Sequence, residues 1–354
     1  MTNRENFLSL IKRQGYERVP VEFELCPILK EKVKKELGAE NYEEYFGMPW
    51  RRVEHIRLAD KDTEKFRKYF VPPLAPDATI DQWGVGYEKS PDSMHMTRMR
   101  HPLEMVETIE ELMDYPFPDY AAGDASHQKA QADAIKARDL IALGSMQCTI
   151  WENSWYMRSM EEMFCDMMDG DEKAAYLLDK SLEAAKIMAK AFIEAGVDVL
   201  YFGDDIGMQH TIMMSEELYC EWLKPRLAEL IAYAKGLNPD ILIFYHSCGF
   251  IEPFIPHLIE VGIDVLNPIQ SESMDFAKIY RTYGEQISFH GTIGTQTVMP
   301  YGTPQQVKEE VWRNLDLAGE KGGLFVAPTH LLEPEVPLAN ILAYVDACRE
   351  YKSK

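Results

Sequence analysis

Short runs of apolar and β-branched residues alternate along the chain with longer stretches in which apolar residues recur every three or four positions. The short runs predict strands and the longer stretches predict amphipathic helices. The predicted strands cover residues 19–25, 140–143, 199–202, 241–245, 265–266, 287–289 and 324–327. The predicted helices cover residues 158–168, 173–195, 215–236, 250–261, 273–283, 304–320 and 338–351. This alternation is typical of βα units built around a parallel sheet.

The alternation continues without a linker to the end of the chain, which predicts one domain over residues 1–354. An open doubly wound sheet and a closed (β/α)8 barrel both fit this pattern. No G-x-G-x-x-G follows an early strand, so the dinucleotide-binding form of the open sheet loses its main support. We therefore expect an α/β fold, a (β/α)8 TIM barrel. Residues 40–135 are less regular, and we expect them to form excursions over the barrel mouth.

Charge and composition narrow the choice of partners. The 58 acidic residues outnumber the 37 basic ones and give a formal charge of -21, which argues against nucleic acid and anionic membranes as partners. The six cysteines are scattered without a C-x-x-C pair, so we expect no structural disulfides. The chain shows neither a signal peptide nor a run of 18 apolar residues, and we expect a cytoplasmic protein.

A histidine and a cysteine follow the apolar strand at residues 241–245, in the segment His246-Ser247-Cys248-Gly249. Residues two apart in an extended chain point the same way, so the imidazole and the thiol can converge at the carboxyl end of the strand. Barrel enzymes keep their active sites at this end, and imidazole with thiolate suits zinc. A core cysteine beside a hydrogen-bonded histidine fits the pattern equally well.

Another histidine, His330, follows the predicted strand at residues 324–327. If both strands belong to one barrel, His330 opens toward the same mouth as His246 and Cys248. Three protein ligands would leave one position free, as in catalytic zinc sites. A helix cap or a packed loop residue is the alternative for His330.

The strand at residues 199–202 ends in two adjacent carboxylates, Asp204 and Asp205, with His210 close behind. Carboxylates between glycines at a strand end suggest metal binding, substrate binding or proton handling. Adjacent residues of an extended chain face opposite ways, so we expect only one of the two carboxylates to enter the site. A solvated turn is the alternative.

Polar and aromatic residues at further strand ends are candidates for substrate contacts. These candidates are Asn267, Gln270 and His290, together with Trp151, Glu152 and Trp155 in an aromatic and amide-rich stretch after residue 143. Aromatic side chains can line the pocket of a flat apolar ligand, but packing in the core explains them equally well.

Taken in order, these residues resemble the uroporphyrinogen decarboxylase superfamily. The resemblance runs from about Arg18 to Tyr351 and is strongest at residues 203–207, at residues 246–249 and from His290 to Asn340. It implies a single (β/α)8 barrel with the site at the carboxyl ends of the strands. The decarboxylase branch needs no metal and binds substrate carboxylates with an N-terminal arginine cluster. Here the corresponding stretch carries Glu22 and Glu24 instead, which argues against that activity.

The other branch contains cobamide-dependent methyltransferases, whose zinc is held by a His-x-Cys pair and a later cysteine. The resemblance implies His246 and Cys248 as the first two ligands, and His330 stands near the position of the third. Imidazole in place of a thiolate leaves zinc a stronger Lewis acid, which favours activation of an oxygen leaving group. Asp204, Asp205 and His210 would then orient the donor or move a proton.

The leading hypothesis is therefore a zinc-dependent methyltransferase that moves a methyl group from a small methylated donor, such as a methoxylated aromatic, to a corrinoid (cobalamin) on a partner protein. The alternatives are methyl transfer from a corrinoid to a thiol such as coenzyme M or to a folate, a metal-free decarboxylase, and a barrel that only binds a tetrapyrrole. The last is the weakest, because the chain has no D-x-H-x-x-G segment.

Overall fold

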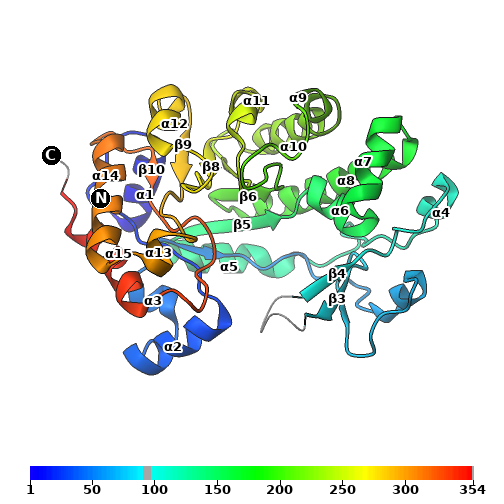
Figure 1. Ribbon diagram of the computed structural model, residues 1–354, viewed down its shortest axis with the longest axis horizontal. Helices are drawn as coiled ribbons and strands as arrows, with labels where there is room; N and C mark the ends of the chain where they lie inside the picture. The colour runs from blue at the N-terminus through cyan, green and yellow to red at the C-terminus, as the bar shows by residue number, and fades with distance from the viewer. Residues whose placement is uncertain (91–96, 353–354) are drawn as a thin grey trace.

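Seven parallel strands form the central sheet of the computed structural model, which describes residues 1–90 and 97–352 (Figure 1). In order across the sheet they are β1 (Trp50–Arg52), β5 (Ile141–Gln147), β6 (Val199–Gly203), β7 (Leu242–His246), β8 (Val265–Asn267), β9 (Ser288–His290) and β10 (Leu324–Phe325). Within this sheet, each strand pairs with the sheet strand that follows it in the sequence, so each connection crosses over on the outside of the sheet. The predicted arrangement of parallel βα units is confirmed.

Helices fill these connections. Helix α5 (Ser126–Ala137) precedes β5, and α6 (Trp151–Arg158), α7 (Met160–Asp169) and α8 (Glu172–Ala195) follow it. After β6 come α9 (Glu216–Leu218), the short π-helix η2 (Tyr219–Leu223) and α10 (Lys224–Leu237), and after β7 come η3 (Glu252–Phe254) and α11 (Ile255–Val261). Helix α12 (Phe276–Tyr283) follows β8, α13 (Val298–Tyr301) and α14 (Pro304–Ala318) follow β9, and α15 (Leu338–Glu350) follows β10. None of the helices in the described ranges has the length and apolar character needed to cross a membrane.

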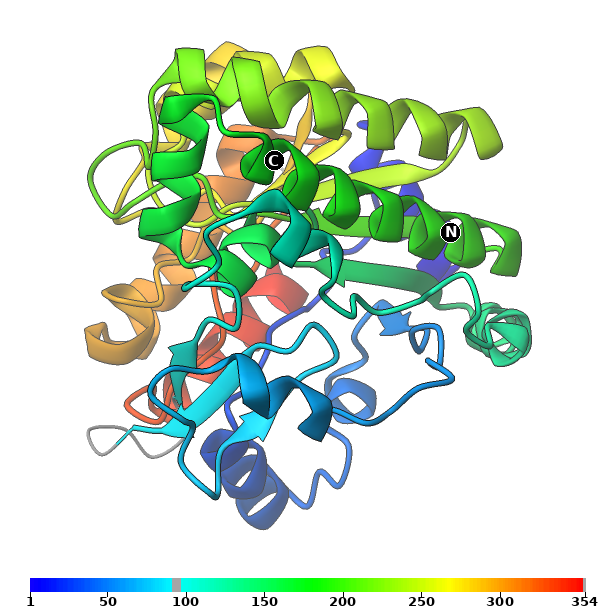
Figure 2. The same ribbon diagram turned by 90° about the vertical axis from the view of Figure 1, so that its right-hand side faces the viewer.

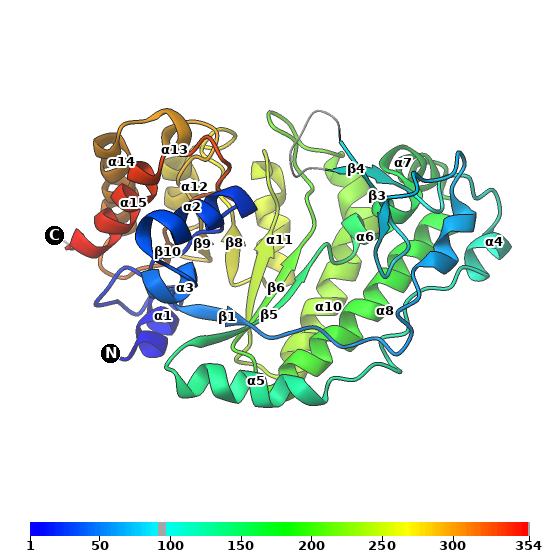
Figure 3. The ribbon, with the colours of Figure 1, turned by 90° about the horizontal axis from the view of Figure 1, so that it is seen from below.

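The sheet curls so that its two edge strands face each other. The ring of Trp50 on β1 lies 5.2 Å from the ring of Phe325 on β10, measured between centroids. Phe7 of helix α1 (Asn3–Ile11) contacts both rings and is fully buried between them. Burial of one such ring contributes about 1.5–3 kcal/mol, so α1 closes this end of the barrel with apolar packing. Figure 3 shows α1 beside β1 and β10.

The predicted first strand differs from the structure. Residues 19–24 belong to no helix or strand, and only Leu25 pairs, in a parallel bridge with Leu332 after β10. The edge strand β1 lies instead in a region that we expected to be irregular. It has only three residues, Trp-Arg-Arg, and therefore lacks the apolar run that predicts a strand.

The remaining N-terminal elements confirm the expected excursions. Helices α2 (Pro27–Leu37) and α3 (Tyr42–Phe46) precede β1, and η1 (Glu64–Tyr69), β2 (Thr79–Ile80), β3 (Gly86–Lys89), β4 (Thr97–Arg100) and α4 (Ile109–Met113) follow it. Strands β2, β3 and β4 form a small antiparallel sheet. The amide of Leu103 donates to the carbonyl of Met157, and the guanidinium of Arg158 donates to the carbonyls of Leu103 and Val106. These bonds fix the excursion to α6, at the carboxyl end of β5 (Figure 2).

Candidate metal centre and adjoining cavities

The period of two along β7 places His246 in the barrel interior. Leu242 and Phe244 belong to the small core cluster inside the barrel, whereas Ile243 packs in the outer core with the helices. His246 is the next residue on the inner side and the last residue of the strand. It pairs in register with Asn267, the last residue of β8, so these two side chains meet at the carboxyl ends of neighbouring strands.

The loops after β6 and β7 are tied together, and this fixes Cys248 and Asp205. Met208 and Phe250 form an antiparallel bridge, and the amide of Ile206 donates to Ser247 Oγ at 3.0 Å. Gly249 turns the chain with φ +82°, and a Cβ there would lie 2.6 Å from the Met208 carbonyl oxygen. Only glycine allows this close approach of the two loops.

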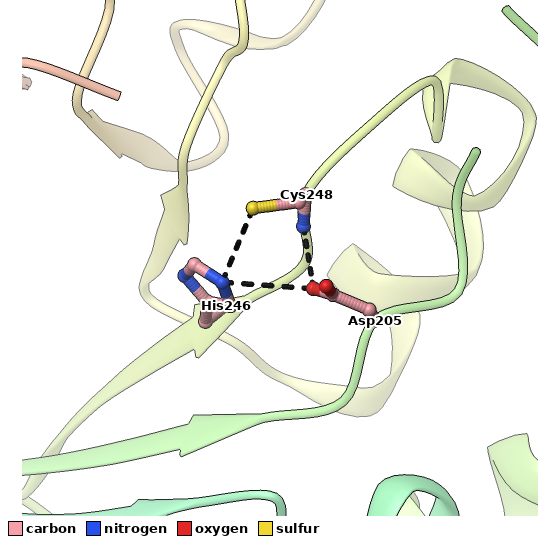
Figure 4. A group of neighbouring side chains, drawn as sticks. All are labelled: Asp205, His246 and Cys248. Carbon is pink, nitrogen blue, oxygen red and sulfur yellow. Dashed lines mark hydrogen bonds and ion pairs between the residues drawn. The ribbon is translucent and has the colours of Figure 1, made fainter. Parts of the chain in front are cut away.

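Asp205, His246 and Cys248 converge on one point (Figure 4). The Nε2 atom of His246 lies 3.5 Å from Cys248 Sγ and 3.5 Å from Asp205 Oδ1. The amide of Cys248 donates to Asp205 Oδ1 at 2.7 Å, which holds the carboxylate in place. The three ligand atoms lie within 4.8 Å of one another, and in the described residues this is the one such group of His, Cys, Asp and Glu.

Asn267 determines which nitrogen of His246 carries the proton. Asn267 Nδ2 donates to the carbonyl oxygen of His290 at 3.1 Å, which identifies the amide nitrogen because a carbonyl can only accept. Asn267 Oδ1 therefore faces His246 Nδ1, 2.6 Å away, and must accept its proton. Burial lowers the pKa of His246, so the ring is neutral near pH 7. The lone pair of Nε2 is then directed toward Cys248 and Asp205.

This donor set fits zinc. Tetrahedral zinc with Zn–N near 2.0 Å and Zn–S near 2.3 Å separates the nitrogen and sulfur ligands by about 3.5 Å, the separation found here between His246 and Cys248. One imidazole, one thiol and one carboxylate are all zinc ligands, and three protein ligands leave one position for a substrate. Asn267 supplies the outer hydrogen bond that orients a ligating histidine.

The acidic groups around this point repel one another. Burial, followed by the charges of Asp205 and Asp204, raises the pKa of Glu152 to about 8. Burial also raises the pKa of Asp204 to about 7. Burial raises the pKa of the Cys248 thiol, and the Asp205 and Glu152 charges add to this effect. Burial is thus the main cause of these shifts, with neighbouring negative charges adding to it at Glu152 and Cys248, and a bound cation would act in the opposite direction.

The structure divides the two aspartates, as the alternation predicted. Asp204 is buried, and its carboxylate accepts from the amides of Ile150 and Glu152 at the start of α6. It therefore caps the N-terminus of that helix. Asp205 is the carboxylate that enters the site. His210 is exposed on the loop after β6 and does not line the cavities beside the three ligand atoms.

The predicted aromatic contacts lie in α6, a helix that the sequence analysis did not predict. Trp151 is fully buried against Phe164, which is core packing. Trp155 stacks edge-on against Tyr156. Of these three residues, Glu152 interacts electrostatically with Asp205, and it accepts from the Tyr156 hydroxyl at 2.7 Å.

Two cavities meet at the candidate centre. The outer one, about 550 Å³, includes Asp205, Cys248, Gln270 and the exposed residue His330 in its lining. The inner one, about 260 Å³, is lined by His246, Asn267, His290 and again His330. His330 thus lies at the rim of both cavities but outside the group of three ligand atoms, where Asp205 stands instead.

Other residues of the site were missed. Tyr201 on β6 donates to Asn267 Oδ1, and Tyr156 on α6 donates to Glu152. In the sequence, Tyr201 and Tyr156 have the pattern of aromatic residues that pack in the core. Arg52 on β1 lines the inner cavity, but the three-residue strand that carries it has no pattern in the sequence. The period of two along β6 could have predicted Tyr201, because Tyr201 follows Val199 on the inner side of that strand.

Comparisons with known proteins show which family this chain resembles. The family model described as uroporphyrinogen decarboxylase (URO-D) matches residues 94–351. "Methylcobamide:CoM methyltransferase MtaA" of Methanosarcina barkeri is 28% identical over 174 residues, 49% of this chain and 48% of that protein. "Methylated-thiol--coenzyme M methyltransferase" of Methanosarcina mazei is 28% identical over 187 residues, 51% of this chain and 45% of that protein. The chain thus spans about half the length of these curated relatives.

Two other proteins match this chain over a larger part of its length. "Uroporphyrinogen decarboxylase" of Pseudomonas syringae pv. syringae is 22% identical over 258 residues, 70% of each chain. A solved structure, "methyltransferase from Methanosarcina mazei", superposes with a TM-score of 0.66 at 18% identity and covers 99% of both chains. That likeness confirms the predicted barrel fold. Since the family model covers well over half of the sequence, this chain belongs to the uroporphyrinogen decarboxylase family.

Proposed function

We propose that this protein is a zinc-dependent methyltransferase that moves a methyl group from a small methylated donor to the cobalt of a corrinoid carried by a separate protein. The observation that carries the proposal is the convergence of Asp205, His246 and Cys248 at the carboxyl end of the barrel. The relatives named as methylcobamide and methylated-thiol methyltransferases support the methyltransferase part of the proposal. The third ligand that we propose is Asp205, in place of His330.

Zinc, when bound, supplies Lewis-acid activation of the donor's heteroatom. The protein's own residues prepare the site for this. Asn267 fixes the tautomer of His246, the amide of Cys248 holds the Asp205 carboxylate, and Gln270 accepts from the Gly249 amide at 2.9 Å. Glu152 lies next to Asp205, and in the metal-free protein its pKa of about 8 lets it hold a proton near neutral pH, which a bound cation would help it to release.

The two cavities suggest where the reactants bind. The donor fits the inner cavity beside His246, which is small and lies within the barrel. The outer cavity is larger, and two exposed apolar side chains, Met208 and Tyr301, stand in its lining. Exposed apolar residues around a cavity favour contact with another protein, here the one that carries the corrinoid. A methoxylated aromatic remains our hypothesis for the donor.

Transfer in the opposite direction, from a corrinoid to a thiol, is the second candidate, because both half-length relatives are named for coenzyme M. The metal-free decarboxylase is less well supported. A substrate rich in carboxylates needs guanidinium partners, whereas the inner cavity holds Glu22 and Glu24 against the single guanidinium of Arg52, which is paired with Glu24.

The test begins with the metal content of the purified protein and of Cys248→Ala, measured by mass spectrometry. We expect about one zinc per chain, lost in the variant. Methyl transfer is then followed from the absorbance of cob(I)alamin with methoxylated aromatics, and in reverse from methylcobalamin with thiols. Absence of zinc after reloading would overturn the proposal, and decarboxylation of a porphyrinogen that survives chelation would establish the metal-free alternative.

A further inference from the structure

The inner cavity carries an excess of negative charge. Its charged lining consists of Glu22, Glu24 and Arg52. Arg52 and Glu24 form an ion pair, and both are partly exposed to solvent. Once this pair is counted as neutral, the charge of Glu22 remains.

Glu22 is 7% exposed, and the guanidinium whose charge acts on it, Arg52, forms its ion pair with Glu24 instead. Its Oε2 lies 3.2 Å from His290 Nε2, the one ion-pair or hydrogen-bond contact of this carboxylate among the described residues. His290 Nδ1 is 2.9 Å from Asn267 Nδ2, an amide donor, so Nδ1 accepts and the ring is neutral, with its proton on Nε2. A buried carboxylate with a single neutral donor is costly without a cation nearby.

Two aromatic side chains also line this cavity. Trp50 and Tyr201 both line it, and the Trp50 ring lies 5.3 Å from the His290 ring that contacts Glu22. Aromatic faces together with a carboxylate bind organic ammonium groups through cation–π and ion-pair contacts. An anionic tail such as a sulfonate would meet the negative charge of Glu22, with Arg52 already engaged by Glu24.

We propose that the inner cavity selects substrates whose tail carries a protonated amine, and that it discriminates against tails that carry a sulfonate or carboxylate. This inference rests on the proposed function, because the reacting heteroatom of the substrate is placed at Asp205, His246 and Cys248 while its tail occupies the inner cavity. It separates this chain from a coenzyme M type of specificity, since the tail of that thiol is a sulfonate.

Three thiols of one length test the proposal: 2-aminoethanethiol, 2-mercaptoethanol and 2-mercaptoethanesulfonate. They share the sulfur that binds the metal and differ in the tail group, which is a cationic ammonium, a neutral hydroxyl or an anionic sulfonate. Binding to the zinc-loaded protein is measured by calorimetry at pH 8, where an ordinary imidazole is neutral. We expect the aminothiol to bind roughly tenfold or more tightly than the sulfonate, with the alcohol between them.

The variant Glu22→Gln keeps an acceptor for His290 and removes the charge. It should reduce the ratio of the aminothiol and sulfonate affinities to near one. Comparing this ratio between two proteins cancels the different acidities of the thiols themselves. Arg52→Gln should change the ratio in the opposite direction, and Glu24→Gln, at a partly exposed position, provides a charge-removing variant if Glu22→Gln does not fold.

Equal affinities for all three thiols, or tighter binding of the sulfonate, would overturn the inference and leave the zinc site intact. A ratio that is unchanged in Glu22→Gln would also overturn it. If the protein takes up no zinc on reloading, the proposed function itself fails. If the zinc-loaded protein binds none of the three thiols, only the present inference fails, so the two failures are distinguishable.

Discussion

Replacement of Asn267 by leucine tests the tautomer argument at the centre of the site. Leucine is similar in size but removes Oδ1, the acceptor of the His246 Nδ1 proton, 2.6 Å away. Without that acceptor the neutral imidazole can carry its proton on Nε2, which is the nitrogen that faces Cys248 and Asp205. The variant must therefore move this proton before the metal can bind.

The size of the effect follows from the contacts. Loss of the outer hydrogen bond of a ligating histidine lowers metal affinity by about 10- to 100-fold, which corresponds to about 1.4–2.7 kcal/mol. Asn267 also bonds to His290 Nδ1 and to the His290 carbonyl, so these buried groups lose a partner as well, whereas the Tyr201 hydroxyl keeps His246 Nδ1 within 3.2 Å. Each unpaired group costs about 1–3 kcal/mol of folding free energy, and we expect a lower melting temperature.

Competition with a chromophoric chelator measures zinc affinity in the folded protein, and thermal unfolding monitors stability separately. Two variants are matched controls. Asn267→Asp keeps an acceptor oxygen for His246 Nδ1 and should retain zinc within a few-fold of the wild type. Tyr201→Phe removes the other donor to Asn267 Oδ1 and should also retain it. Wild-type zinc affinity in a folded Asn267→Leu would refute the reasoning.

Four further outcomes are expected. Cys248→Ala loses zinc but stays folded, because a ligand at a strand end contributes little to the core; global unfolding seen by circular dichroism would contradict this. Asp205→Asn lowers zinc affinity more than His330→Ala does, and the reverse order in a chelator titration would restore His330 as the third ligand. In the metal-free protein, Glu152 contributes a fall of about 3 kcal/mol in the free energy of unfolding between pH 5.5 and 8, because folding raises its pKa from 4.5 to about 8 and the folded state binds the extra proton in that window; the raised pKa of Asp204 adds to the fall. Denaturant unfolding of Glu152→Gln should lack this part of the pH dependence, and an identical pH profile would exclude Glu152 as its source.

The sequence alone determined the barrel and the first half of the site. The alternation of short apolar runs and amphipathic stretches is a local property, and it correctly predicted strands β5 to β10 and most of the helices. The period of two within β7 also placed His246 inside the barrel, since Leu242 and Phe244 precede it on the same side. Asp205 and Cys248 stood at strand ends, and that position is visible in the sequence.

The tertiary structure decided which strand-end residues meet. Asp204 and Asp205 are equivalent in the sequence, but the amides at the start of α6 bind Asp204, and the bridge between Met208 and Phe250 brings Asp205 to Cys248. His330 also follows a strand, but it lies at the rim of the two cavities. The path of each loop depends on hydrogen bonds between segments that are about 40 or more residues apart. Such contacts leave no periodic pattern in the sequence, so the fold is readable from local chemistry while the composition of the site is not.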